Sequence, residues 1–134
     1  WSPSGEQIAF TSDRTGTPQI WVIGADGLNL RRLTSESYAD RPTWSPAANE
    51  IAFASRTGTY YDIKIFEVDK GTTRQITFGE GSNESPAWAP NGKHLAFMST
   101  RAGRASQIFT VDRDGRNLRQ VTRDGNNFTP NWSQ

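Results

Sequence analysis

The chain has 134 residues, is 34% hydrophobic, carries a formal net charge of +1 and contains no cysteine. That length is enough for one domain, and the small net charge gives no electrostatic reason to expect a nucleic acid or a membrane surface as partner. The lack of cysteine excludes a disulfide framework and a zinc site of the cysteine type. No apolar stretch approaches the roughly 20 residues that a membrane-spanning helix needs.

A repeat organises the whole chain. Tryptophan followed by Ser-Pro or Ala-Pro occurs at Trp1, Trp44 and Trp88, and Trp132 starts a fourth copy, at spacings of 43, 44 and 44 residues. A period of about 40–45 residues with four strand-like segments is typical of a β-propeller blade. We predict an all-β chain of three blades, with repeats at residues 1–43 (first strand incomplete), 44–87 and 88–131, and with residues 132–134 ending the ring-closing first strand of a further blade.

Four strands are predicted in each repeat. The first covers residues 41–45, 85–88 and 129–132, where prolines at the margins suit a short strand end. The second covers residues 50–55 and its counterparts, because apolar Ile51 and Phe53 alternate with alanine. The third covers residues 19–23, 63–68 and 107–111. Asp26-Gly27 and Asp114-Gly115 then form hairpin turns into the fourth strand. No segment has a helical period.

Three blades are too few to close a ring, because propellers have about four to eight. The ring could be completed in two ways. Two copies related by a two-fold axis would close a six-bladed ring, with Trp132 of each copy completing the first blade of the other. Alternatively, the chain belongs to a longer polypeptide that supplies the missing blades. Since the sequence begins at Trp1 and not at methionine, we expect any signal peptide or upstream domain to lie outside it.

Residues that recur in every repeat answer a need shared by all blades, so we interpret them as architectural. The tryptophans are predicted to lie in the core or between blades. The arginines that precede a glycine by two residues are predicted to anchor loops, bonding backbone carbonyls or a neighbouring blade. These residues are Trp44, Trp88, Trp132, Arg14, Arg56 and Arg101. The densest arginine group, Arg113, Arg116, Arg119 and Arg123, is explained by a solvated outer strand.

The segments that differ between repeats are residues 35–41, 78–85 and 123–129. They join the last strand of one blade to the first strand of the next, near the central channel. Variable loops on a rigid scaffold often bind partners, and these loops carry aromatic, charged and amide groups of the kind that interfaces favour. The alternative is that they are solvated loops with ordinary turn residues. The candidates are Tyr38, Asp40, Arg41, Asn83, Glu84, Asn127 and Phe128.

Catalysis has little support in the sequence. The one histidine, His94, follows the Asn91-Gly92 turn, and a catalytic triad needs convergent partners. Neither a Gly-x-Ser-x-Gly elbow nor a phosphate-binding Gly-x-x-x-x-Gly-Lys loop occurs. Residues 112–115 are similar to the start of a calcium loop but lack its remaining ligands. Asp40 and Glu84 could share a cation in the channel. We predict no catalytic residue, no cofactor and no metal site.

The chain contains the motifs Pro-x-Trp-Ser-Pro, Ile-Ala-Phe-x-Ser, Arg-x-Gly, Gln-Ile-Trp-Val, Asp-Gly and Arg-x-Leu-Thr. Together they resemble, over the whole chain, the repeat of TolB, the periplasmic propeller protein of the Tol–Pal cell-envelope system. This resemblance implies a six-bladed propeller behind an α/β domain, secretion to the periplasm and non-covalent binding of the lipoprotein Pal. This chain would be the C-terminal half of that propeller. The repeat is also similar to blades of tricorn-type and dipeptidyl-peptidase propellers.

The resemblance also implies site residues. In TolB proteins, positions that affect Pal binding lie four, three and six residues before the tryptophan. Here they correspond to Asp40, Arg41, Glu84, Ser85, Phe128 and Thr129, and to Tyr38, Ser82 and Asn126. Some family members have a histidine at the last of these positions in one blade, and this chain has none there.

The predicted function is a non-catalytic scaffold that binds a Pal-like lipoprotein in the periplasm. The alternative is the gating propeller of a tricorn-like or dipeptidyl-peptidase-like hydrolase. An α/β domain and a signal peptide before Trp1 would favour the first, and a hydrolase domain the second.

Overall fold

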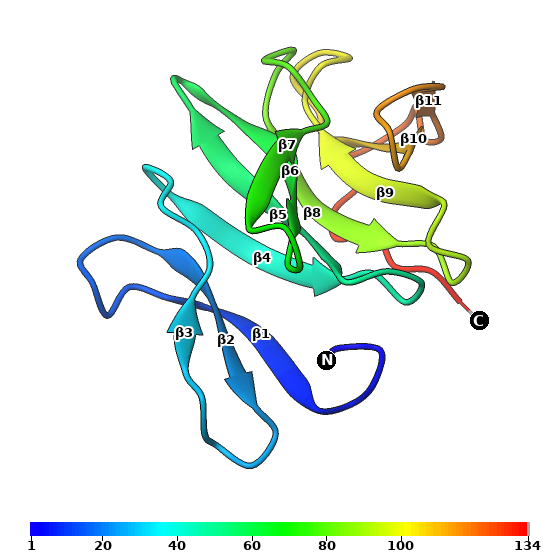
Figure 1. Ribbon diagram of the computed structural model, residues 1–134. Helices are drawn as coiled ribbons and strands as arrows, with labels where there is room; N and C mark the ends of the chain where they lie inside the picture. The colour runs from blue at the N-terminus through cyan, green and yellow to red at the C-terminus, as the bar shows by residue number, and fades with distance from the viewer. Residues whose placement is uncertain (134) are drawn as a thin grey trace.

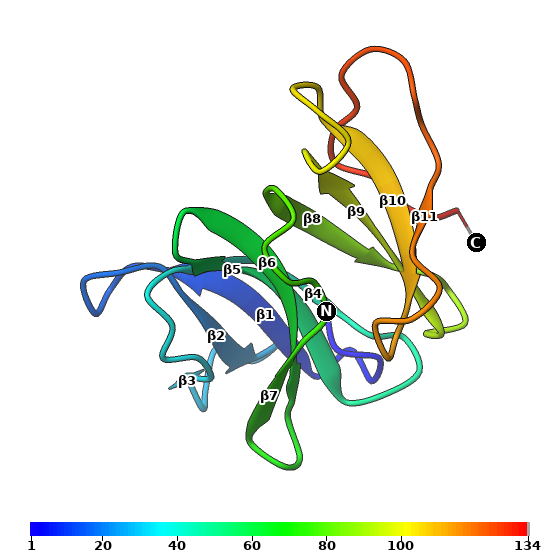
Figure 2. The same ribbon diagram turned by 90° about the horizontal axis from the view of Figure 1, so that it is seen from above.

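The computed structural model describes residues 1–133, so Gln134, the last residue of the predicted closing segment, lies outside the described residues. Within residues 1–133, eleven strands form three antiparallel sheets, and no helix long and apolar enough to cross a membrane is present. The sheets lie side by side in an open arc that does not close into a ring (Figures 1 and 2). The predicted all-β propeller architecture is confirmed.

Each sheet is one blade whose strands follow one another in chain order. Blade 1 consists of β1 (Gln7–Ser12), β2 (Gln19–Gly24) and β3 (Arg31–Arg32). Blade 2 consists of β4 (Ala39–Trp44), β5 (Glu50–Thr57), β6 (Tyr60–Glu67) and β7 (Thr72–Gln75). Blade 3 consists of β8 (Asn83–Trp88), β9 (His94–Ser99), β10 (Gln107–Asp112) and β11 (Arg119–Gln120).

The repeat and the sheet are offset by one strand. Trp44 ends β4 and Trp88 ends β8, which are the first strands of their blades. A repeat counted from tryptophan therefore holds the later strands of one blade and the first strand of the next. Residues 129–133, predicted as a further first strand, form no strand among the described residues.

A bulge interrupts the first strand of blades 2 and 3. The ladder to the neighbouring strand shifts register between Asp40 and Thr43, and again at the equivalent place in β8. The prolines predicted at strand margins therefore lie inside the strands, where a bulge tolerates a residue without an N–H. Arg41, Ser85 and Thr129, each directly before a proline, have φ of 53°, 55° and 43°. Such left-handed conformations cost of order 1–3 kcal/mol each in residues other than glycine.

The repeated tryptophans lie between blades. Trp44 packs in a cluster built from blades 1 and 2, and Trp88, 7% exposed, in one built from blades 2 and 3. The indole Nε1 of Trp88 donates to the carbonyl of Thr43 at 3.1 Å. Trp132 repeats this bond with the carbonyl of Ala87 at 3.0 Å, although it is 36% exposed. Each of these two bonds ties a tryptophan to the first strand of the preceding blade.

An ionic cluster forms a second joint between blades 2 and 3. The side chain of Glu50 on β5 is only 6% exposed. Arg113, in the turn after β10, donates to its two oxygens at 2.5 and 2.7 Å, and Arg74 of β7 lies 3.4 Å away. Burial alone would raise the pKa of Glu50, but the hydrogen bonds and charge of Arg113, with the charge of Arg74, outweigh it and lower that pKa. Arg113 is exposed, with 47% of its side chain open to solvent, but it lies in the turn after β10 and not on an outer strand, and it pairs with Glu50.

Candidate functional site

The segments that join successive blades all lie at one end of the sheets. Because every sheet is antiparallel, the residues before β4 and β8 lie at the end where the β5–β6 hairpin turns and where the β9–β10 loop begins. We call this end the linker face. In Figure 1 the segment before β8 and the β9–β10 loop lie together at the top of the view.

Arg41 connects all three blades at the bulge. Its guanidinium Nη1 donates to the hydroxyl of Ser85 on β8 at 2.7 Å. Its backbone N–H donates to the hydroxyl of Thr11 on β1 at 3.2 Å, and its Nε lies 3.8 Å from a carboxylate oxygen of Asp40. The bulge therefore positions an arginine that the surrounding strands hold in place.

Two carboxyl groups accompany this arginine. Burial raises the pKa of Asp40, although the charge of Arg41 and a 3.3 Å hydrogen bond from the Tyr38 hydroxyl offset part of the rise. Burial also raises the pKa of Glu84, where the charge of Arg41 acts against it and the charge of Asp40 adds to it. Burial, followed by the charge of Asp40, raises the pKa of Tyr38. Tyr38, Asp40, Arg41, Glu84 and Ser85 thus form one cluster, which we call the channel-edge cluster.

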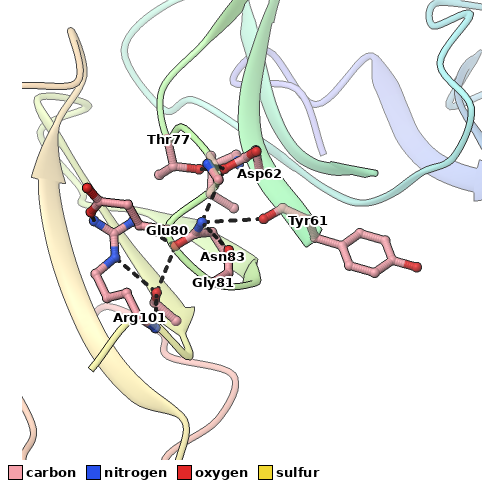
Figure 3. A network of polar contacts seen from close by, with 10 residues as sticks. Tyr61, Asp62, Thr77, Glu80, Gly81, Asn83 and Arg101 are labelled. Carbon is pink, nitrogen blue, oxygen red and sulfur yellow. Dashed lines mark hydrogen bonds and ion pairs between the residues drawn. The ribbon is translucent and has the colours of Figure 1, made fainter. Parts of the chain in front are cut away.

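Asn83 is an internal link and does not face a partner. Its side chain is completely buried. Its amide donates to the Tyr61 carbonyl at 3.3 Å and to Asp62 at 3.2 Å in blade 2. Its oxygen accepts from Ser99 and Arg101 of blade 3, both at 2.8 Å (Figure 3). The prediction that Asn83 binds a partner is wrong, because all of these bonds lie within the protein.

The other predicted linker residues differ in exposure. Asn127 is half-buried, and its side-chain amide donates to the side-chain oxygen of Gln107 at 3.1 Å, so its side chain, like that of Asn83, is bonded within the protein. Ser82 is half-buried, with its N–H bonded to Thr100. Phe128 is 59% exposed, and Asn126 and Thr129 are exposed. Phe128 of the linker 123–129 is therefore open to a partner, as is Phe78 of the linker 78–85, which is 72% exposed.

The three arginines predicted as loop anchors are not equivalent. Arg101 bonds Ser99 and Asn83 and stacks on aromatic rings of its own blade. Arg14 is exposed, bonds Ser12 at 2.9 Å and stacks on Trp21. Arg56 lies inside β5 and bonds the nearby carbonyl of Gly58 at 3.3 Å. The difference arises because the β5–β6 hairpin replaces the longer loops of the other two blades.

Metal and catalytic sites receive no support from the described residues. Among residues 1–133, no group of three or more histidine, cysteine, aspartate or glutamate side chains is arranged to hold a metal ion. His94 pairs with Asp112 at 2.9 Å, directly across the β9–β10 ladder. That pair is explained as a cross-strand contact.

The family assignment follows from comparison with known proteins. The sequence matches the TolB beta propeller domain over residues 1–134. The chain belongs to the TolB β-propeller family. Over 88 residues it is 40% identical to the Tol-Pal system protein TolB of Anaeromyxobacter dehalogenans, and over 110 residues it is 32% identical to an uncharacterized protein of Agrobacterium fabrum. The aligned parts cover 66% and 73% of this chain.

The fold of this TolB-family chain agrees with solved structures. TolB from Acinetobacter baumannii superposes with a TM-score of 0.85 and 29% identity, over 98% of this chain. The chain spans 33% of that structure, and 20% and 38% of the two curated relatives, so these proteins are much longer. An oligogalacturonate lyase shares the fold alone, with a TM-score of 0.69 and 8% identity over 88% of this chain and 37% of its own.

Proposed function

We propose that this chain is part of a non-catalytic, periplasmic scaffold of the TolB type that binds a Pal-like lipoprotein through its linker face. The observation that carries the proposal is the channel-edge cluster, because Asp40, Arg41, Glu84 and Ser85 stand at the positions that the TolB resemblance assigns to Pal binding. The relative of Anaeromyxobacter dehalogenans, named as a Tol-Pal system protein, supports the same system.

The cluster offers a partner a fixed set of polar groups. The Arg41 backbone is bonded to blade 1 and its guanidinium to Ser85 of blade 3, which reduces the freedom that the side chain loses when a partner binds. Asp40 and Glu84 add acceptors, and Phe128 adds an exposed ring 59% open to solvent. Arginine and aromatic side chains carry much of the binding energy in protein interfaces. The combination favours a protein partner over a small-molecule substrate.

The gating propeller of a hydrolase is a weaker candidate. It needs a catalytic domain outside this chain, and the likeness to oligogalacturonate lyase, at 8% identity, extends to the fold alone. Closure of a six-bladed ring, by a second copy or by further blades of a longer chain, stays a prediction.

We expect four substitutions together, Asp40→Ala, Arg41→Ala, Glu84→Ala and Phe128→Ala, to abolish binding of the soluble domain of a Pal-like lipoprotein, measured by isothermal titration calorimetry. The circular dichroism spectrum should stay that of the parent. The matched control is Arg116→Ala with Arg119→Ala, both exposed and away from the linkers, which should leave affinity nearly unchanged because exposed charges carry small energies. Equal loss in both variants would contradict the linker face as the binding surface.

A further inference from the structure

A groove lies on the linker face between blades 2 and 3, outside the channel-edge cluster. Its volume is about 520 Å³. The β5–β6 hairpin, the segment before β8 and the β9–β10 loop each contribute to its wall. The lining residues are Tyr60, Glu80, Gly81, Thr100, Arg101 and Gly103. None of them is a position that the TolB resemblance connects with Pal.

One wall of the groove is particular to blade 2. Strands β5 and β6 have eight residues each, whereas β1, β2, β9 and β10 have six. The extension carries Tyr60, which is 45% exposed and borders the groove. Tyrosine is enriched in interfaces because its ring combines an apolar face with a polar end. Since only one blade has the extension, no requirement common to all blades explains it.

The floor of the groove is rigid. The side chain of Arg101 is only 12% exposed, and its guanidinium bonds Ser99 at 3.0 Å and Asn83 at 2.8 Å. It also lies 5.3 Å from the centre of the Phe109 ring. Gly81 has φ of 75°, and a Cβ there would stand 2.8 Å from the backbone nitrogen of Arg101. The linker therefore packs directly on blade 3, and the groove is formed before any partner arrives.

The charged side chains that line the groove are one guanidinium, that of the largely buried Arg101, and one carboxylate, that of the exposed Glu80. Two carboxyl groups, Glu80 and buried Asp62, act on one guanidinium, that of Arg101 (Figure 3). Asp62 accepts hydrogen bonds within the protein, from Thr77 among others. Glu80 lies 3.3 Å from Arg101, but its side chain is 75% exposed. An exposed carboxylate beside an exposed aromatic ring suits a cation, which can pair with the one and lie over the other.

We propose that this groove receives a lysine or arginine side chain of the protein that binds the linker face. The alkyl stem would lie along Tyr60 and the charged end would pair with Glu80. The inference rests on the proposed function and names the chemistry of a contact that the partner makes away from the channel. The groove continues the same surface, because Glu80 and Gly81 directly precede Ser82, and Glu84 follows two residues later in the same linker.

The test is titration calorimetry of the parent and of Tyr60→Ala and Glu80→Gln, with the soluble domain of a Pal-like lipoprotein as titrant. Each variant should weaken binding by about five-fold, since cation contacts at exposed sites are modest. The affinity of Glu80→Gln should also fall less steeply with added sodium chloride than that of the parent. The matched control is Glu6→Gln, an exposed glutamate that directly precedes β1 at the opposite end of the strands, which should bind as the parent does.

The outcomes separate the groove from the proposed function. If Tyr60→Ala and Glu80→Gln bind as tightly as the parent while the fourfold linker variant does not bind, the groove assignment is wrong and the proposed function stands. Tighter binding by Glu80→Gln would mean an acidic occupant and would also overturn the assignment. If the parent itself does not bind the lipoprotein domain, the proposed function is wrong, and the groove assignment falls with it.

Discussion

Replacing Trp88 by alanine should destabilise the chain by about 3–5 kcal/mol, the usual cost of deleting a large buried aromatic side chain. The indole is 7% exposed and belongs to one buried cluster with Ile65 of blade 2 and Leu95 of blade 3. Its truncation also leaves the Thr43 carbonyl without the Nε1–H donor that now bonds it at 3.1 Å. Domains are stable by only about 5–15 kcal/mol. The variant should therefore unfold at a temperature far below the melting temperature of the parent.

Trp1 provides the matched control for this experiment. It is 70% exposed, so Trp1→Ala should change the free energy of unfolding by no more than about 0.5 kcal/mol, as surface substitutions usually do. Both variants can be compared by thermal melting followed by circular dichroism. A melting temperature for Trp88→Ala within one or two degrees of the parent, on the order of the control, would show that Trp88 does not join the blades.

The second large effect is expected at Arg113. Arg113→Ala should cost about 3 kcal/mol, because it leaves the Glu50 carboxylate, 6% exposed, with only the more distant Arg74. Glu50→Gln should cost less, since no buried charge remains. Arg116→Ala is the control, because that side chain is 82% exposed and pairs only with Asp114 at 3.7 Å. Urea unfolding of the three variants measures these differences. Equal losses of stability for Arg113→Ala and Arg116→Ala would contradict the conclusion that the Arg113–Glu50 pair joins blades 2 and 3.

The same joint predicts a pH dependence. The pKa of Glu50 is lower in the folded chain than its ordinary value, so its contribution to stability is complete above the unfolded pKa, near 4.3. That contribution is lost as the pH falls through the lower folded pKa. Urea unfolding from pH 6 down to about pH 3 should therefore show a steeper loss of stability in the parent than in Glu50→Gln. Identical slopes for the two would show that Glu50 does not carry the effect.

The repeat made the fold predictable. Tryptophan spacing, alternation around Phe53 and the Asp-Gly turns led to blades, and Gly27 and Gly115 adopt the positive φ that the turns need, 82° and 87°. The bulge could not be predicted, because the residue before a proline is ordinarily extended, whereas Arg41 has φ of 53°. Ser85 and Thr129, also directly before prolines, have the same left-handed conformation, so it belongs to the repeat although the general preference of such residues does not predict it.

The candidate site was predictable in part. Comparison of the repeats separated linkers from scaffold, and Asp40, Arg41 and Glu84 do lie together. Asn83 has the polarity of an interface residue, but its side chain forms hydrogen bonds with Asp62 and Arg101, which are distant from it in the chain. Burial by distant segments is not visible in composition. The signal for Tyr60 is present in the sequence, since Tyr60 and Tyr61 have no counterpart in the other repeats.

Mapping the bound surface residue by residue tests the central claim most directly. The chain, labelled with nitrogen-15, would be titrated with the soluble domain of a Pal-like lipoprotein while its amide resonances are followed by nuclear magnetic resonance. Binding through the linker face predicts shifts confined to residues 35–41, 57–60, 78–85, 100–103 and 123–129. Shifts concentrated instead at the opposite end of the strands, in residues 45–49, 91–94 and 113–117, would contradict that claim.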